Sequence, residues 1–497
     1  MNDTGTGAAR WRSYAEQTFG IDLRGLAVYR ISLGVLMLID ILDRGRDLVA
    51  HYTDAGVLPR DMAATVPGRL SLHMVSGGAT WQGLLFAIHA VCALALILGV
   101  RTRWTLPALW FLLISLHTRN PLVLYGGDIE LRMIVFWTLF LPVSALWSWD
   151  ARSDRPPGDR VFGMNSAAYV LQIASIYVVT ALLKSGLDWK NGTAVYYALQ
   201  IDHFTSPFGK WLLNFPEVLS ILTPATWWFE LLGPVLLLVP NPWVRAGTVL
   251  GFMGMHVGFE ACMEIGLFPE ICVVAWIPLL PSAFWDRLRL PRLPSGTLRP
   301  SATASLIALI FTLYGVWWNL GSVGGKRFAV TGEWRTPAQL LRLDQYWDMF
   351  APQPLKDDGW FVIVGERADG TETDVLHGDA VSWDKPALIA TYYPNERWRK
   401  YMRNLWNKKY KEMRTPYLRW QCERWNDEAA AGAELVSVSM YYMKEQSTPP
   451  GHDPSPIEKV FLRKHLCKQP PKGEAPTPDV EPKEAAPKEA APEADPN

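Results

Sequence analysis

The fold class is decided by predominantly apolar runs such as residues 165–186, which read NSAAYVLQIASIYVVTALLKSG. Within this run Lys184 is the only charged side chain. A helix of this length is about 33 Å long, enough to cross the hydrocarbon core of a bilayer, which is about 30 Å thick. Similar runs recur through the first 320 residues. The sequence therefore predicts a bundle of membrane-spanning helices.

Nine such runs are predicted to span the membrane, which makes the fold an all-α polytopic bundle. They cover residues 25–43, 80–100, 103–118, 131–148, 165–186, 216–239, 243–262, 265–284 and 302–320. Soluble core helices are the alternative, but these are usually shorter and more clearly amphipathic. Tryptophans collect at the ends of the runs, as in the aromatic belt of membrane proteins. They are Trp104, Trp147, Trp149, Trp189, Trp243, Trp285, Trp317 and Trp318.

The average composition resembles that of a soluble protein and hides a difference in charge density between residues 1–320 and the rest of the chain. The 497 residues carry 48 Lys+Arg and 48 Asp+Glu. Residues 1–320 hold 23 basic and 21 acidic side chains, whereas the shorter remainder holds 25 and 27. Zero net charge excludes a nucleic-acid binder that works through bulk positive charge. Five cysteines in a chain of this length exclude a disulfide scaffold.

Lysines and arginines in the loops predict the orientation in the membrane. With the N-terminus in the cytoplasm, the inner segments carry 13 basic residues and the outer loops carry seven. We therefore expect a cytoplasmic segment (1–24), a bundle in the inner membrane (25–320) and a small extracytoplasmic α+β domain (321–467). The last residues, 468–497, repeat Pro-Lys-Glu-Ala-Ala and are expected to be a disordered tail.

The expected outer domain contains a predicted β-hairpin. Residues 360–366 and 371–376 alternate as strands around the turn Ala368-Asp369-Gly370. Residues 398–425 are basic and aromatic at helical spacing, and residues 435–443 are typical of a further strand. Cys422 and Cys467 lie in the same compartment, where a disulfide and two free thiols are both compatible with their spacing.

Ionisable and polar side chains at the predicted spans are the main candidates for function, because burying a charge in lipid is costly. The expected orientation places most of them in the outer half of the bundle. The candidates are Asp40, Asn120, Tyr125, Asp128, Lys184, Asp188, Trp189, Glu230, His256, Glu260 and Glu264. Their convergence predicts a site at the outer face.

Several of these groups also have a structural explanation. Lys184 could extend to the interface or pair with Asp188 one turn on. Equally, a lysine in an apolar setting can lose its proton and serve as a base. Glu230 lies near the middle of its span and needs a partner. Arg30 and Asp40 in the first span are expected to be members of structural ion pairs.

His256, Glu260 and Glu264 are expected to share one helical face. Such a row suits a metal site or a proton relay, but a structural hydrogen-bond network is the favoured explanation, and no metal is assigned. The polar loop residues after the third span could equally be turn and interface residues. The sequence contains no Walker loop, dinucleotide fingerprint, zinc-binding Cys pair or nucleophile elbow in a supporting context.

Several motifs of the sequence resemble those of the HTTM family, which comprises the vitamin K-dependent gamma-carboxylase and its bacterial relatives. The resemblance covers about residues 20–380. Its motifs are Tyr29-Arg30-Ile31 with Gly34, Met37 and Asp40; Asn120-Pro121 with Tyr125-Gly126-Gly127-Asp128; Leu141-Pro142; Trp147-Ser148-Trp149-Asp150; Lys184 with Asp188-Trp189 and Gly192-Thr193-Ala194; His256 with Gly266-Leu267-Phe268-Pro269; and Trp347-Asp348-Met349-Phe350-Ala351-Pro352.

The resemblance implies an active site at the extracytoplasmic face. In the carboxylase, a lysine at the end of a span acts as base on vitamin K hydroquinone, and carbon dioxide is finally added to a glutamate side chain. Lys184 is similar to that lysine in position. Pro121, however, stands where the carboxylase has a functional histidine, which argues against glutamate carboxylation.

Two hypotheses follow. In the first, the protein binds a reduced, vitamin K-like quinone in an outward-facing pocket, with Lys184, His256 and Glu230 as catalytic groups. The pocket would be lined by Asn120, Tyr125, Asp128, Asp188, Trp189 and Glu260. In the second, a non-catalytic membrane protein supports the maturation or export of a partner. The expected partners are the lipid bilayer and an extracytoplasmic protein or peptide, and no nucleic acid. A transporter is disfavoured because no internal repeat is visible.

Overall fold

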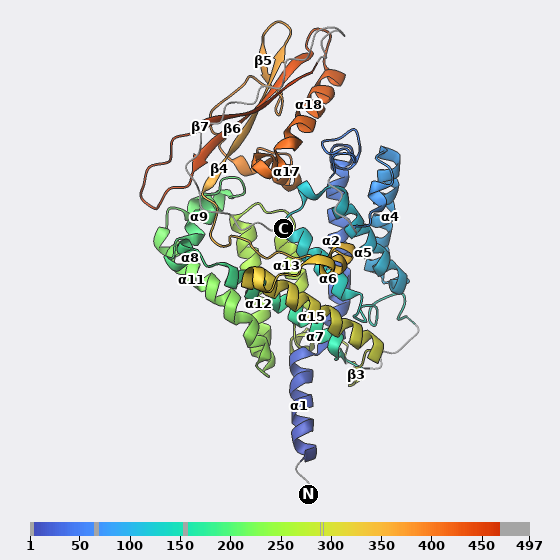
Figure 1. The fold of residues 1–497 in the computed structure, drawn as a ribbon. Helices are drawn as coiled ribbons and strands as arrows, with labels where there is room; N and C mark the ends of the chain where they lie inside the picture. The colour runs from blue at the N-terminus through green and yellow to red at the C-terminus, as the bar shows by residue number, and fades with distance from the viewer. Residues whose placement is uncertain (1–3, 64–68, 153–157, 289, 292, 468–497) are drawn as a thin grey trace. The chain divides into compact units, whose positions relative to one another are not determined.

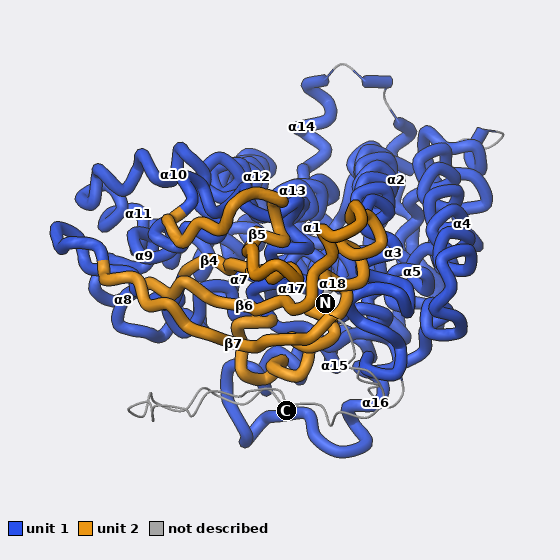
Figure 2. The backbone as a smooth tube through the Cα atoms, turned by 90° about the horizontal axis from the view of Figure 1, so that it is seen from above, with its two compact units in different colours: residues 1–358, 386–404, 446–454 blue, residues 359–385, 405–445, 455–497 orange. Residues whose placement is uncertain are grey.

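The computed structural model describes residues 4–63, 69–152, 158–288, 290–291 and 293–467, and these are mostly helical (Figure 1). The chain divides into two compact units, coloured blue and orange in Figure 2. Unit 1 comprises residues 1–358, 386–404 and 446–454, and unit 2 comprises residues 359–385, 405–445 and 455–497. Unit 1 thus takes in residues 321–358, which the sequence assigned to the C-terminal domain. The tail predicted over 468–497 lies outside the described residues.

Unit 1 contains a helix at each predicted apolar run, but not always of the predicted length. These helices are α2 (Leu23–Arg46), α4 (Ala79–Leu98), α5 (Thr102–Arg119), α6 (Gly126–Thr138), α7 (Met164–Leu183), α11 (Pro216–Leu232), α12 (Pro242–Cys262), α13 (Phe268–Trp276) and α15 (Ala302–Gly324). Shorter helices are α1 (Thr4–Phe19), α3 (Leu48–Tyr52), α8 (Leu187–Lys190), α9 (Ala194–Gln200), α10 (Pro207–Leu212), α14 (Ser282–Arg287) and α16 (Thr336–Leu341). A small sheet, in the order β1 (Ile21–Asp22), β2 (Arg160–Val161) and β3 (Thr297–Leu298), joins three connecting segments.

Within the described residues, five helices are long and apolar enough to cross a membrane. They are α2, α4, α7, α11 with the 3-10 turn that extends it to Leu238, and α15 with its extension to Arg327. The segment Phe268–Leu279 is apolar but shorter. The structure therefore agrees with a polytopic membrane protein, whereas the nine predicted spans are not confirmed.

Prolines explain where the predicted runs are cut short. The predicted span 131–148 is wrong in its second half, because α6 begins at Gly126 and ends at Thr138, ahead of Pro142. A residue that precedes proline is disfavoured in helical conformation, and proline itself cannot donate a backbone hydrogen bond. The helix α11 passes into a 3-10 turn at Gly233-Pro234 for the same reason. Pro278 and Pro281 break the run 265–284 into α13, a 3-10 turn and α14.

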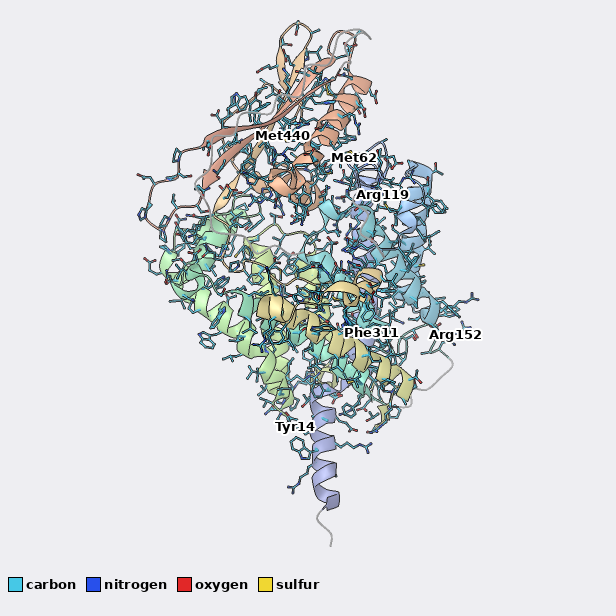
Figure 3. All side chains as sticks on the ribbon, in the orientation of Figure 1. Tyr14, Met62, Arg119, Arg152, Phe311 and Met440 are labelled. Atoms are coloured by element: carbon cyan, nitrogen blue, oxygen red, sulfur yellow. A yellow bond between two sulfur atoms is a disulfide. The ribbon has the colours of Figure 1, made fainter. Side chains whose placement is uncertain are left out.

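Aromatic rings hold the centre of the bundle together. Trp276 of α13 stacks on Phe252 of α12 with 4.4 Å between ring centroids, and Phe252 lies 4.3 Å from Phe229 of α11. Phe311 of α15, labelled in Figure 3, packs edge-on against Phe136 of α6 at 5.1 Å. Large rings contribute most of the apolar area that a core buries. The contacts therefore fix α11, α12 and α13 against one another and α15 against α6.

Seven of the eight tryptophans predicted for an interfacial belt are either exposed or buried, and Trp317 is half-buried. Trp104, Trp147, Trp149 and Trp243 are exposed, as a belt requires. Trp189, Trp285 and Trp318 are buried, and Trp318 donates its indole N–H to the backbone carbonyl of Gln345 at 2.8 Å. The belt interpretation is wrong for these three residues, because their rings pack inside unit 1.

Unit 2 is built on most of a four-stranded sheet in the order β5-β4-β6-β7. Its strands are β4 (Asp357–Arg367), β5 (Glu372–Asp374), β6 (Leu435–Gln446) and β7 (Glu458–Leu466), and its main helix is α18 (Arg414–Glu428). Strands β4 and β5 pair antiparallel, with Glu366 opposite Glu372 and Gly370 in the left-handed region (φ 81°) at the turn. This arrangement confirms the predicted hairpin, since glycine adopts that conformation at no steric cost. The strand predicted over 435–443 is likewise confirmed as β6.

Cys422 on α18 and Cys467, directly after β7, form a disulfide. The bond closes a loop across 45 residues of sequence and ties the helix to the edge strand of the sheet. A cross-link of this kind stabilises a fold mainly by restricting the unfolded chain.

Removing this bond should lower the free energy of unfolding of unit 2 by about 2–4 kcal/mol. We expect the double variant Cys422→Ala/Cys467→Ala to unfold at a lower temperature than the wild type. Thermal unfolding of the full chain in detergent, with and without reductant, measures the effect. The reductant should lower the wild-type Tm and leave that of the double variant unchanged, and equal sensitivity of both proteins would contradict the assignment.

Candidate functional site

Lys184 lies at the C-terminal end of α7, where its side chain is buried. Its Nζ donates a hydrogen bond of 2.5 Å to Oε2 of Glu230 on α11, and the two side chains are only 4% and 6% exposed. The ammonium also lies over the ring of Trp189, 4.4 Å from its centroid. Glu230 thus has the partner that its depth requires. Lys184 neither extends to solvent nor pairs with Asp188, so both structural explanations offered from the sequence are wrong.

Asp188 and Trp189 on α8 instead hold the segment that contains the motif 347–352. Nζ of Lys356 donates to Oδ1 of Asp188 at 3.1 Å, and the indole N–H of Trp189 donates to the carbonyl of Phe350 at 2.9 Å. Both Asp188 and Trp189 are buried. They therefore place residues 347–352 beside the end of α7, next to Lys184.

His256 lies on α12, and its imidazole contacts the face of α7 on which Lys184 also lies. Its Nε2 lies 2.8 Å from the hydroxyl of Tyr177, which also accepts a 2.7 Å hydrogen bond from the indole N–H of Trp276 on α13. Tyr177 precedes Lys184 by two helical turns, which places both on one face of α7. The structure therefore connects His256 to this face through Tyr177.

Glu260 and Glu264 do not join His256. Glu260 is exposed, and α12 ends at Cys262, after which Met263 is extended (φ −144°, ψ 134°). Glu264 therefore lies beyond the helix, where the spacing of a helical face no longer applies. The predicted row is therefore wrong for Glu264, while Glu260, four residues after His256 on α12, keeps the helical spacing but is exposed.

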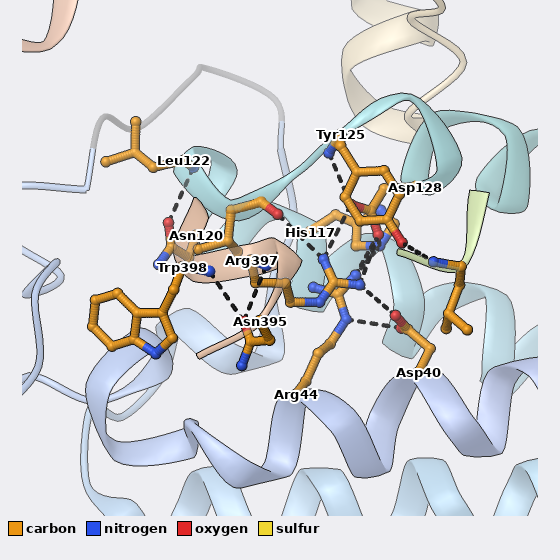
Figure 4. A network of polar contacts seen from close by, with 12 residues as sticks. Asp40, Arg44, His117, Asn120, Leu122, Tyr125, Asp128, Asn395, Arg397 and Trp398 are labelled. Atoms are coloured by element: carbon orange, nitrogen blue, oxygen red, sulfur yellow. Dashed lines mark hydrogen bonds and ion pairs between the residues drawn. The ribbon is translucent and has the colours of Figure 1, made fainter. Parts of the chain in front are cut away.

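A second cluster of buried charges contains two carboxylates and two guanidinium groups (Figure 4). Arg44 on α2 donates through Nε to Oδ2 of Asp40 at 2.8 Å, and through Nη2 to Oδ1 of Asp128 at the start of α6. Arg397, in the part of α17 (Glu396–Trp406) that belongs to unit 1, donates through Nη2 to Asp40 and through Nη1 to Oδ2 of Asp128 at 3.2 Å. All four side chains are almost fully buried. The charges alternate in sign and cancel.

Asp128 keeps its negative charge in this setting. Burial alone would raise the pKa of its carboxyl group, but the positive charges of Arg397 and Arg44 outweigh burial and hold the pKa below its usual range. Oδ2 of Asp128 also accepts the backbone N–H of Tyr125 at 3.0 Å, which caps the start of α6. The hydroxyl of Tyr125 accepts the backbone N–H of Leu267 at 3.1 Å, one residue after Gly266 turns the chain in the left-handed region (φ 62°).

Both polar atoms of the Asn120 side-chain amide form hydrogen bonds. Its Oδ1 accepts the backbone N–H of Leu122 at 3.0 Å, and its Nδ2 donates to the carbonyl of His51 at 2.9 Å. Of the six predicted pocket residues, Asp188 and Trp189 lie around Lys184, and Asn120, Tyr125 and Asp128 lie in or beside the charge cluster, whereas the exposed Glu260 belongs to neither. Asp40 is a member of an ion pair, as predicted, but the prediction is wrong for Arg30, whose Nη2 donates to the carbonyl of Trp147 at 2.6 Å.

The sequence did not assign Arg44 and Arg397 to a site. The spacing of Asp40 and Arg44, four residues apart on one helix, is a signal that could have identified the first pair. Arg397 lies 357 residues after Asp40, and no local pattern connects them.

His51 on α3 lies beside this cluster, with its ring centroid 4.2 Å from that of Trp398. Burial, followed by the positive charges of Arg397, Arg44 and Arg119, lowers the pKa of His51 to about 3. The folded protein therefore holds this imidazole in its neutral form throughout the physiological range.

Breaking the charge cluster should destabilise unit 1 strongly. Arg397→Ala leaves two buried carboxylates with a single arginine, a change that costs about 3–5 kcal/mol. Arg46→Ala is the matched control, because its ion pair with Asp43 is exposed and such pairs contribute about 1 kcal/mol or less. Thermal unfolding in detergent should show a much lower Tm for Arg397→Ala alone, and equal shifts for both variants would disprove a stabilising role.

His51 should make the protein sensitive to acid. An unfolded histidine has a pKa of about 6.5, so between about pH 6.5 and 3 the unfolded chain binds a proton that the folded chain does not. Stability should therefore fall with falling pH by about 1.4 kcal/mol per pH unit in this window. His51→Phe keeps a ring beside Trp398 and should remove this contribution. Tm profiles of both proteins from pH 7 to pH 4 test it, and parallel profiles would refute it.

The sequence profile of the HTTM domain matches residues 20–285, which is more than half of the chain. The matched region contains Lys184, Glu230 and His256 together with Asp40 and Asp128, whereas Arg397 lies outside it. No solved structure matches the chain. The protein therefore belongs to the HTTM family and is a membrane protein related to the gamma-carboxylases.

Proposed function

We propose that this protein is a membrane enzyme in which Lys184 acts as a base on a reduced, quinone-type lipid. The observation that supports the proposal is the burial of Lys184 against Glu230. Two separate charges are costly in an apolar environment. Transfer of the shared proton from Lys184 to Glu230 converts the ion pair into a neutral amine and a neutral acid. Lys184 then has the free electron pair that a base needs.

The residues around Lys184 suit this role. A reduced quinone supplies a hydroxyl proton and two electrons, and it becomes reactive toward oxygen once that proton is removed. Lys184 takes the hydroxyl proton and becomes an ammonium ion, while Glu230 holds the proton that the amine gave up. The ring of Trp189 lies over Nζ of Lys184 and stabilises the returning positive charge.

The site is proposed to face the extracytoplasmic side of the inner membrane, as the distribution of basic loop residues favours. An extracytoplasmic protein or peptide would then have access to it. Glutamate carboxylation is not part of the proposal. Pro121, where the carboxylase has a histidine, begins a 3-10 turn (Pro121–Val123), and its side chain has no proton to exchange.

Oxygen uptake driven by a reduced naphthoquinone tests the base. The purified protein in lipid nanodiscs should consume oxygen, and Lys184→Ala should reduce the rate by about a hundredfold or more, the usual contribution of a general base. Glu230→Gln should also reduce the rate, because an amide cannot take up the proton of the ammonium group.

Lys190→Ala is the matched control, since Lys190 is an exposed lysine on the next helix, α8, and should leave the rate unchanged. If Lys184→Ala keeps the wild-type rate, Lys184 is not the base. The alternative, a non-catalytic protein that supports the maturation of a partner, would then be favoured.

A further inference from the structure

The hydrogen bonds around Tyr177 determine which ring nitrogen of His256 carries the proton. The indole N–H of Trp276 can only donate, and it donates to the Tyr177 hydroxyl at 2.7 Å. That hydroxyl has one proton of its own, and Nε2 of His256 lies 2.8 Å away. If Nε2 carried the proton, both the hydroxyl proton and the Nδ1 lone pair would lack a partner. The arrangement with fewest unpaired groups has Tyr177 donating to Nε2, and His256 is then protonated on Nδ1.

This tautomer leaves one buried donor unused. Nδ1 of His256 has no hydrogen-bond partner within the described part of the chain, and the residue is 2% exposed. The rings of Phe259 and Phe268 stand edge-on to the imidazole, with centroids 5.5 and 5.6 Å away. Buried polar groups in native proteins nearly always have a partner, so an exception calls for an explanation.

We propose that the Nδ1–H of His256 donates a hydrogen bond to an uncharged oxygen, a carbonyl or a hydroxyl, of a lipid-soluble ligand. An anion would lose its hydration here, and the neighbouring rings of Phe259 and Phe268 carry no positive charge that could replace the lost water. The aromatic surroundings therefore favour a neutral acceptor. A metal ion is disfavoured, because the Nε2 lone pair receives the Tyr177 proton and Nδ1 carries a proton of its own.

The inference rests on the proposed function and identifies the group that recognises the ligand. Tyr177 and Lys184 lie on one face of α7, about 10 Å apart along its axis. A quinone-type ring has oxygens at opposite positions, and in this proposal one faces Lys184 while the other accepts from His256. Tyr177 acts as a positioning residue that fixes the tautomer of His256.

Binding of an oxidised quinone tests the His256 contact separately from catalysis, because an oxidised quinone has no hydroxyl proton for Lys184 to remove. We would titrate 2-methyl-1,4-naphthoquinone into the full chain in nanodiscs and measure Kd calorimetrically. His256→Leu should weaken binding about tenfold, the value of one buried hydrogen bond. His256→Asn keeps an amide donor near the position of Nδ1 and should bind within about threefold of the wild type. Equal Kd values for the wild type and the Leu variant would overturn the inference.

Solid-state ¹⁵N spectra of histidine-labelled protein test the tautomer directly. The His256 signals, assigned by their loss in His256→Asn, should show a protonated Nδ1 and an unprotonated Nε2. Tyr177→Phe removes the proton that Nε2 accepts and should abolish this preference. A protonated Nε2 in the wild type would overturn the inference even if the oxygen uptake still depends on Lys184. If neither quinone binding nor oxygen uptake is found, the proposed function and the ligand assigned here fail together.

Discussion

A charge inside an apolar helical bundle is stable only beside an opposite charge or a hydrogen-bond partner, and this constraint organises unit 1. Lys184 and Glu230 meet between α7 and α11. Asp40, Arg44, Asp128 and Arg397 meet between α2, α6 and the first turns of α17. Apolar packing tolerates small slips between helices, whereas a charge without its partner is strongly unfavourable. The two clusters therefore define which helices meet and at what height.

The same constraint has different chemical consequences in the two clusters. Arginine stays protonated under all conditions that a protein meets, so Arg44 and Arg397 can hold helices together around Asp128 but cannot give up a proton. Lysine gives up its proton far more readily when it is buried. The single pair of Lys184 and Glu230 is therefore the arrangement in which proton transfer changes the charge of both partners. This contrast is why the proposed chemistry is assigned to Lys184 and not to the larger cluster.

Local patterns predicted those parts of the structure that depend on neighbouring residues. The hairpin of β4 and β5 followed from the turn at Gly370, and the helices followed from apolar runs. The lengths of α6 and α13 did not, because apolar composition continues past Pro142 and Pro278, where backbone geometry ends the helices. Hydrophobicity records which residues avoid water but not where a proline interrupts the hydrogen bonds.

The candidate site could be predicted as a set of residues but not as a set of contacts. Lys184 was identified because a lysine at the end of an apolar run is unusual, yet Glu230 lies 46 residues away on another helix. Helical spacing predicted Glu260 beside His256, whereas the hydrogen-bond partner of His256 in the structure is Tyr177 on another helix. Periodicity describes one helix at a time, whereas a partner on another helix depends on how the helices pack.

The groups with a proposed chemical role lie within the family match, whereas Arg397, which stabilises the bundle, lies outside it. Tyr177, Lys184, Glu230, His256 and Trp276 all lie within residues 20–285, so every group assigned a chemical role belongs to the HTTM domain. Arg397 comes from a later segment that returns to the bundle and completes a charge-neutral cluster there. Arg397 therefore contributes stability to the bundle and does not itself exchange a proton.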